Sequence, residues 1–224
     1  MEADPLPFML PFERERTNPQ AVMYGFYLYF LGLSFRGVSR ALDPFVNRSH
    51  TAVWKWVQRY EPRRVFDVKR VQAFLVGETY VKVGSFEAWV WVAVEPVHRY
   101  ILRVYLSRHQ NMVVAQLFLK GLVDRYGKRV VYSDGGTWYP EACAALGLEH
   151  RLRSPYEKSL MERANQYLKD RVEGFDDYYP CTKEGCDLVH VRHWLNLFVD
   201  MHYARRRCIR FGDLITFLSG GEVR

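Results

Sequence analysis

The stretch FLVGETYVKV, residues 74–83, is the first strand that the sequence predicts. Most of its residues are β-branched, aromatic or aliphatic, which is typical of a buried strand. Its centre nevertheless holds a glycine, Gly77, followed directly by an acid, Glu78. Glycine weakens the interior of a strand, so its presence here points to a reason outside the strand itself.

The sequence after this stretch continues with strands and helices in a definite order. Two more apolar runs, 87–96 and 99–107, follow at distances short enough for two hairpins. Periodicity and the C-capping Gly127 then predict a helix over 111–127, a strand over 129–134, a helix over 140–147, a strand over 149–153 and a helix over 159–173. Three antiparallel strands before the first crossover predict an α/β fold, an RNase H-like mixed sheet flanked by helices.

The residues before this half of the chain have a helical pattern. Ser34 and Ser49 are expected N-caps for the second and third of three short helices, in the segments 19–32, 34–45 and 47–62. Three helices joined by tight turns predict an N-terminal helix-turn-helix domain over 18–62. A small helical bundle with a solvated polar face is the alternative. The last helix presents four candidate DNA contacts: Thr51, Lys55, Gln58 and Arg59.

The remaining segments complete the expected domain organisation. Residues 1–17 read as an irregular arm, 63–72 as a basic linker, and 73–224 as the sheet domain with a C-terminal helix. Lys and Arg outnumber Asp and Glu by 32 to 25, and this surplus suits a polyanionic partner. No secretory signal opens the chain, and its most apolar run is too short to span a membrane, so we expect a cytoplasmic protein with no membrane partner.

Two acids of the second half are candidates for a metal site. Asp134 follows a predicted strand and precedes two glycines, at the sheet edge where ligands collect in α/β folds. Glu162 begins a polar stripe on the last predicted helix of this half, which continues to Lys169. A turn aspartate and a solvated helix face are the alternatives. Carboxylates that converge from a strand end and a helix hold two Mg²⁺ ions in many phosphodiester-processing sites.

Five segments together carry a resemblance to a known family. The chain resembles the DDE transposases of small prokaryotic insertion sequences, especially archaeal ones with a helix-turn-helix and a retroviral-integrase-like catalytic core. The similarity extends over about residues 18–217. The segments are LSFRGVSRAL, ETYVKV, WVWVAVEP, VVYSDGGTWYPEACAALGLEHR and MERANQYLKDRVEGFDDYYPC.

The resemblance implies roles for individual residues. The first strand of the family usually reads Asp-Glu-Thr, and here Gly77 takes the place of that first metal-binding Asp. Asp134 matches the second acid and Glu162 the third. Lys169 matches the basic residue that follows and is expected to take part in both catalysis and DNA binding. Neighbours on a strand point to opposite faces, so Glu78 is not expected to replace the missing carboxylate. The implied cofactor is a two-ion Mg²⁺ or Mn²⁺ site, weakened or absent because of Gly77.

The resemblance also implies partners. An intact enzyme of this kind binds the terminal inverted repeats of its element as double-stranded DNA, cleaves a strand end and joins it to target DNA. Because two element ends must meet, a homodimer on nucleoid DNA is expected. Two further functions remain open: a catalytically dead, transposase-derived DNA-binding protein, and an RNase H-like nuclease unrelated to transposition.

The C-terminal part adds two weaker candidates. Cys181 and Cys186 have a spacing that fits a zinc site or a local disulfide, with free packed thiols as the default, and zinc is not expected. Three arginines near the end of the last predicted helix are expected either to cap that helix or to contact phosphates: Arg205, Arg206 and Arg207.

Overall fold

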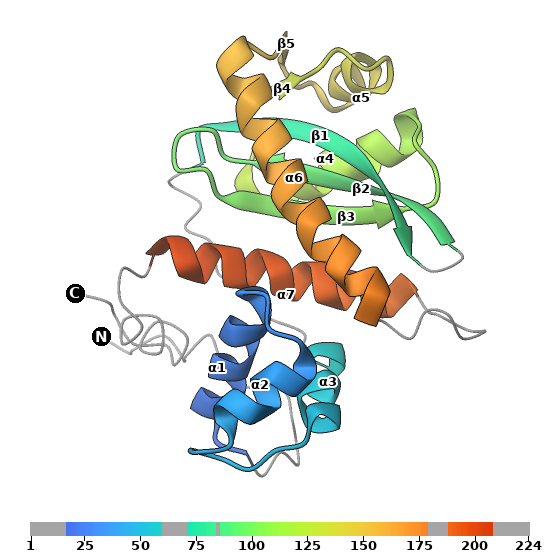
Figure 1. Ribbon diagram of the computed structural model, residues 1–224. Coiled ribbons are helices and arrows are strands. Elements are labelled where there is room, and N and C mark those ends of the chain that lie inside the picture. The colour runs from blue at the N-terminus through green and yellow to red at the C-terminus, as the bar shows by residue number, and fades with distance from the viewer. Residues whose placement is uncertain (1–16, 60–70, 84–85, 179–187, 208–224) are drawn as a thin grey trace. The chain divides into compact units, whose positions relative to one another are not determined.

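The computed structural model describes residues 17–59, 71–83, 86–178 and 188–207, which belong to two compact units (Figure 1). The first unit comprises residues 1–65 and 187–224, and the second comprises residues 66–186. Within the described ranges, none of the helices combines the length and the apolar character needed to cross a membrane.

The second unit is built on a five-stranded mixed sheet. Its strands are β1 (Ala73–Val83), β2 (Phe86–Val94), β3 (Ile101–Ser107), β4 (Val130–Ser133) and β5 (His150–Leu152). They lie in the order β3-β2-β1-β4-β5. The first three are antiparallel, whereas β4 runs parallel to both β1 and β5. This topology confirms the RNase H-like sheet that the sequence predicts.

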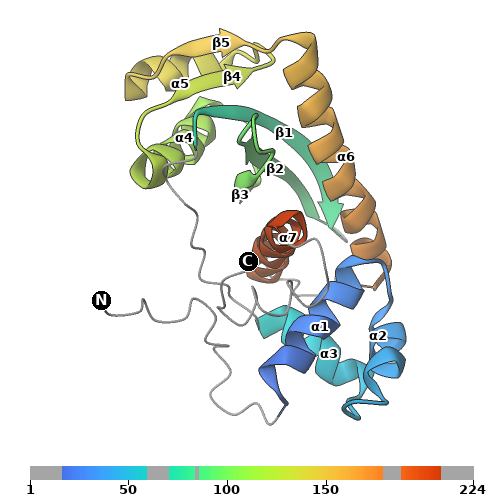
Figure 2. The same ribbon diagram turned by 90° about the vertical axis from the view of Figure 1, so that its left-hand side faces the viewer.

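Helices cover both faces of this sheet. They are α4 (Met112–Tyr126), α5 (Trp138–Leu146) and α6 (Pro155–Tyr178). Figure 2 shows α4 and α5 on one side of the strands and α6 along the other. Because side chains alternate along a strand, β1 contributes to both layers. Phe74 and Val76 belong to the core cluster under α4 and α5, together with Trp91 of β2 and Phe118 of α4.

Glu78 lies on the same face of β1 as Phe74 and Val76, the face toward α5, and its side chain is half-buried. The hydroxyl of Tyr139 on α5 donates to Glu78 Oε2 at 2.5 Å, and the side-chain amide of Gln110 donates to Oε1 at 3.0 Å. Burial raises the pKa of Glu78, an effect that these two hydrogen bonds oppose and the nearby charge of Asp134 reinforces. The carboxyl group therefore links β1 to α5 and to the segment before α4.

The described part of the first unit is helical. It contains α1 (Pro19–Phe30), α2 (Phe35–Leu42), α3 (His50–Arg59) and α7 (Leu188–Arg207). The predicted caps are confirmed: the Ser34 hydroxyl accepts from the Gly37 N–H at 3.1 Å, and the Ser49 hydroxyl accepts from the Ala52 N–H at 3.3 Å.

Helix α7 packs against α1 and α3, although the sequence analysis placed it with the sheet domain. Trp194 lies 5.6 Å from Phe30 of α1 between ring centroids, and its indole N–H donates to the Tyr29 hydroxyl at 3.1 Å. Phe198 extends the same aromatic group, 6.1 Å from Phe30. The apolar periodicity of α7 predicts a buried face but does not specify which element covers it.

We predict that Glu78 makes stability fall as pH rises. An acid whose pKa is higher in the folded state than its ordinary 4.5 binds more protons when folded, so it stabilises the fold at low pH and loses that effect as pH rises through the folded pKa. The free energy of unfolding of the parent minus that of Glu78→Gln should therefore decrease from about pH 4.5 upward and then level off.

Urea denaturation at a series of pH values measures this difference, and Glu141→Gln is the matched control because Glu141 is exposed on the same helix as Tyr139. A difference that stays constant or increases with pH would contradict the prediction.

Candidate functional site

Asp134 is the first residue after β4 and lies where the sequence predicts, at the C-terminal edge of the parallel strands. Gly135 has a φ of 86°, a left-handed conformation that favours glycine and turns the chain sharply. The Gly136 N–H donates to Asp134 Oδ1 at 3.1 Å. The SDGG segment therefore fixes one oxygen of the carboxylate within its own turn.

Arg153 is the corresponding first residue after β5. Its backbone N–H donates to the Ser133 carbonyl at 2.9 Å, which extends the parallel ladder beyond the pair of Ser133 and Leu152. Its guanidinium Nη2 lies 2.8 Å from Asp134 Oδ2. The Arg153 side chain is only 9% exposed, whereas that of Asp134 is 55% exposed. A buried guanidinium is thus paired with the candidate metal-binding carboxylate.

The start of α6 is fixed directly after Arg153. The Ser154 hydroxyl accepts from the Glu157 N–H at 3.5 Å, the Glu157 carboxylate accepts from the Ser154 N–H at 2.7 Å, and Pro155 is the first helical residue. This capping box sets the point at which α6 leaves the strand end. The helix then crosses β1 and β2 (Figure 1).

Gly77 lies under α6, on the opposite face of β1 from Glu78. A Cβ placed on Gly77 would lie 3.1 Å from Met161 Cγ, 3.3 Å from Met161 Cε and 3.6 Å from Arg153 Nη1. Met161 is fully buried, so its thioether side chain fills the layer above the glycine. The alternation that the sequence predicts is present, and Glu78 faces Tyr139 instead of this layer.

The other expected acid and its helical stripe lie on α6. Glu162 and Gln166 are exposed, Asn165 and Lys169 are half-buried, and Met161 and Leu168 form the buried face. Glu162 is thus the neighbour of Met161, the residue that covers Gly77, but its side chain is exposed whereas that of Met161 is buried.

The described residues do not fit a divalent metal ion. Gly77 offers no ligand, and the Asp134 carboxylate is already paired with the cationic guanidinium of Arg153. No group of three or more Asp, Glu, His or Cys side chains in the described ranges is arranged to hold a metal. A two-ion site of the kind the resemblance implies takes three carboxylates, and with glycine at position 77 only Asp134 and Glu162 remain, so the implied Mg²⁺ is not supported by this arrangement.

Arg153 and Met161 are the two residues that sequence reasoning missed. A signal for Arg153 was present, because it ends a predicted strand of the same parallel sheet as Asp134 and so falls at the same edge. Met161 carried no such signal, since an apolar residue at helical spacing indicates only a buried face.

The candidates outside this site are distributed as follows. Thr51, Lys55 and Arg59 are exposed on α3 at a spacing of four residues, which places them on one side of the helix. Gln58, expected on the same polar side, is only 9% exposed, because α1, α2 and α7 all pack against α3 and widen its buried arc.

The remaining candidates cannot be placed by their side chains. Cys181 and Cys186 lie outside the described residues. Arg205, Arg206 and Arg207 belong to the last turns of α7, where only the backbone is described.

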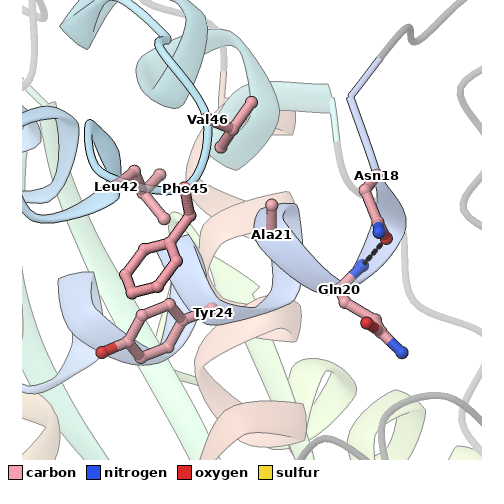
Figure 3. Close-up of a pocket in the computed structure, with 7 residues that line it drawn as sticks. All are labelled: Asn18, Gln20, Ala21, Tyr24, Leu42, Phe45 and Val46. Atoms are coloured by element: carbon pink, nitrogen blue, oxygen red, sulfur yellow. Dashed lines mark hydrogen bonds between the residues drawn. The ribbon is translucent and has the colours of Figure 1, made fainter.

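The first unit also contains a hollow between α1 and the segment after α2 (Figure 3). It has a volume of about 520 Å³ and includes Phe45, whose side chain is 79% exposed. Its other lining residues are Asn18, Gln20, Ala21, Tyr24, Leu42 and Val46. No ionisable side chain other than the Tyr24 phenol lines it, so the hollow has no carboxylate or cationic group for catalysis.

Known proteins resemble this chain along most of its length. A family described as a DDE domain matches residues 71–182. An uncharacterized protein of Methanocaldococcus jannaschii is 30% identical over 175 residues, which cover 75% of this chain and 80% of that protein. The transposase for the insertion sequence-like element IS431mec of Staphylococcus aureus is 27% identical over 163 residues, covering 67% of this chain and 72% of that protein.

Solved structures of retroviral integrases are also similar. The catalytic core domain of HTLV-2 integrase in complex with magnesium is 14% identical, with a TM-score of 0.43 over 56% of this chain and 83% of that one. The catalytic core domain of BIV integrase is 21% identical, with a TM-score of 0.40 over 55% of this chain and 80% of that one.

The matched family covers half of the chain and includes the whole of the sheet described above, with Gly77, Asp134 and Glu162 inside it. The chain therefore belongs to the DDE transposase family, with an RNase H-like catalytic core.

Proposed function

We propose that this chain is a DNA transposase of the DDE type that binds the terminal inverted repeats of its element but is impaired in strand cleavage. The observation that carries the proposal is the state of the strand-end site, by which we mean Gly77, Asp134 and Arg153. Gly77 supplies no carboxylate, and the Asp134 carboxylate forms an ion pair with Arg153, with 2.8 Å between Oδ2 and Nη2. Glycine at the position of the first acid removes both charge and orientation from any metal-dependent reaction.

DNA recognition is assigned to the first unit. Thr51, Lys55 and Arg59 line one exposed side of α3, while Val53, Trp56 and Val57 form its buried side. A short helix with this division, preceded by α2 and a turn, is suited to lie in a major groove with its basic residues near bases and phosphates. Gln58 is not included, because its side chain is buried.

The expected working form is a homodimer on double-stranded DNA, since the two ends of an element must be held together before they react. In this proposal, residues 18–62 bind DNA, and the sheet domain from residue 73 contains the strand-end site. Binding to chromosomal DNA would associate the chain with the nucleoid.

A second candidate is a transposase-derived DNA-binding protein without any catalytic role. The pairing of Asp134 with a buried arginine favours it, because this pairing satisfies the acid without a metal. The two candidates differ in whether strand transfer at the element ends still takes place at a low rate.

We predict that α3 carries repeat binding. Lys55→Ala and Arg59→Ala should each weaken binding of a duplex with the terminal repeat and lower the slope of log K against log salt by about 1. Fluorescence anisotropy at several salt concentrations measures both quantities. Lys120→Ala is the matched control, because Lys120 is exposed on α4 in the other unit. If Lys120→Ala weakens repeat binding as much as the α3 variants do, the prediction that α3 carries repeat binding is wrong.

We further predict that the chain binds repeat DNA and cuts it at no more than a low rate. A strand-cleavage assay with Mg²⁺ or Mn²⁺ should give only a trace of product with the parent, because the site lacks its first acid. Loss of that trace in Asp134→Asn would favour the impaired transposase, and no difference between the two chains would favour the second candidate. Rapid and complete cutting by the parent that Asp134→Asn abolishes would contradict the proposed impairment.

A further inference from the structure

The guanidinium of Arg153 is held in one place by its surroundings. Its backbone is tied to β4 by the hydrogen bond to the Ser133 carbonyl, and the capped start of α6 follows directly. Its side chain is nine-tenths buried. Charged side chains are rarely buried to this extent without a partner, and Asp134 is the carboxylate that supplies one here.

Each nitrogen of this guanidinium has a distinct environment. Nη2 contacts the Asp134 carboxylate, and Nη1 points toward the space above Gly77, 3.6 Å from the position of an added Cβ. Nε is buried and has no hydrogen-bond partner among the described residues. A buried donor without an acceptor is costly, so the unused Nε indicates that an acceptor is missing near this guanidinium.

Arginine differs from a metal ion in that its charge cannot leave the site. The guanidinium remains protonated at every physiological pH and presents its donors in a fixed fork. A divalent cation that approached Asp134 would meet this positive charge at the same carboxylate. A metal ion bound to that carboxylate would lie close to the guanidinium, so the positive charge of Arg153 would oppose its binding.

We propose that Arg153 is the resident cation of the strand-end site, where it neutralises Asp134 and excludes a divalent metal ion. The inference rests on the proposed function in one respect: it takes this site to be the altered counterpart of a metal-binding DDE site. In that counterpart, Arg153 supplies next to Asp134 the positive charge that a metal ion would supply.

The proposal makes Gly77 and Arg153 interdependent. The carboxylate oxygens of an aspartate at position 77 would lie two bonds beyond its Cβ, and that Cβ lies 3.6 Å from Nη1 of the guanidinium. Arg153 would then pair with two acids instead of one and would neutralise the restored ligand. Restoring the acid alone is therefore insufficient, and the arginine must also be removed before a metal can bind.

Mn²⁺ binding to the full-length chain, measured by isothermal titration calorimetry without DNA, tests this. The parent and Gly77→Asp should show no saturable site up to about millimolar Mn²⁺. Gly77→Asp/Arg153→Gln should bind at least about tenfold more tightly than Gly77→Asp. Adding Asp134→Asn to that pair should abolish the binding. Arg151→Gln in the Gly77→Asp background is the matched control, because Arg151 is exposed and pairs with Glu149 at 2.6 Å.

Two outcomes would overturn the proposal. One is Mn²⁺ binding by Gly77→Asp that equals binding by the double variant, since Arg153 would then exclude nothing. The other is saturable Mn²⁺ binding by the parent that depends on Asp134. If Gly77→Asp/Arg153→Gln does not fold, Arg153→Met replaces the glutamine variant, because an unbranched apolar side chain preserves most of the buried volume.

These measurements are independent of the DNA-binding function. If the unsubstituted chain binds repeat DNA through α3 and also binds Mn²⁺, the proposed DNA recognition stands and the proposed role of Arg153 is wrong. If the chain does not bind repeat DNA, and Gly77→Asp gains Mn²⁺ affinity only when Arg153 is also removed, the role of Arg153 stands and the proposed DNA recognition is wrong.

Discussion

The structure of the second unit depends on one constraint, the alternation of side chains along β1 in a strand that is covered on both faces. Phe74, Val76 and Glu78 face α4 and α5, whereas Gly77 faces α6. A shift of one residue would exchange the two sets, and would place a carboxylate against Met161 and a glycine against Tyr139. Pairing of β1 with both β2 and β4 prevents that shift.

Glu78 on β1 and Asp134 after β4 interact electrostatically but have different surroundings. Glu78 is a bracing group whose pKa is raised by burial and further raised by the charge of Asp134. Asp134 is half-exposed and is neutralised by Arg153. The charge of Arg153 acts to lower the pKa of Glu78, but burial outweighs it and the pKa of Glu78 is raised.

Much of this arrangement could be predicted from local sequence. The helix caps at Ser34 and Ser49 and the position of Asp134 depend on residues close together in the chain, and all are as predicted. Side chains that are fixed by distant contacts were not predictable in this way. Gln58 is buried because three other helices surround α3, and Met161 meets Gly77 through the crossing of α6 over β1. A periodic pattern identifies a buried face without naming what covers it.

The packing of α7 on α1 and α3 has a consequence for synthesis. The hydrogen bond from Trp194 to Tyr29 joins residues 165 positions apart, and all of β1 to α6 lies between them in the chain. During translation the sheet has all its strands before Trp194 leaves the ribosome, whereas α1 exposes Phe30 until α7 arrives. Helix α3 thus acquires its full support last, so a nascent chain completes its RNase H-like core before its helical unit.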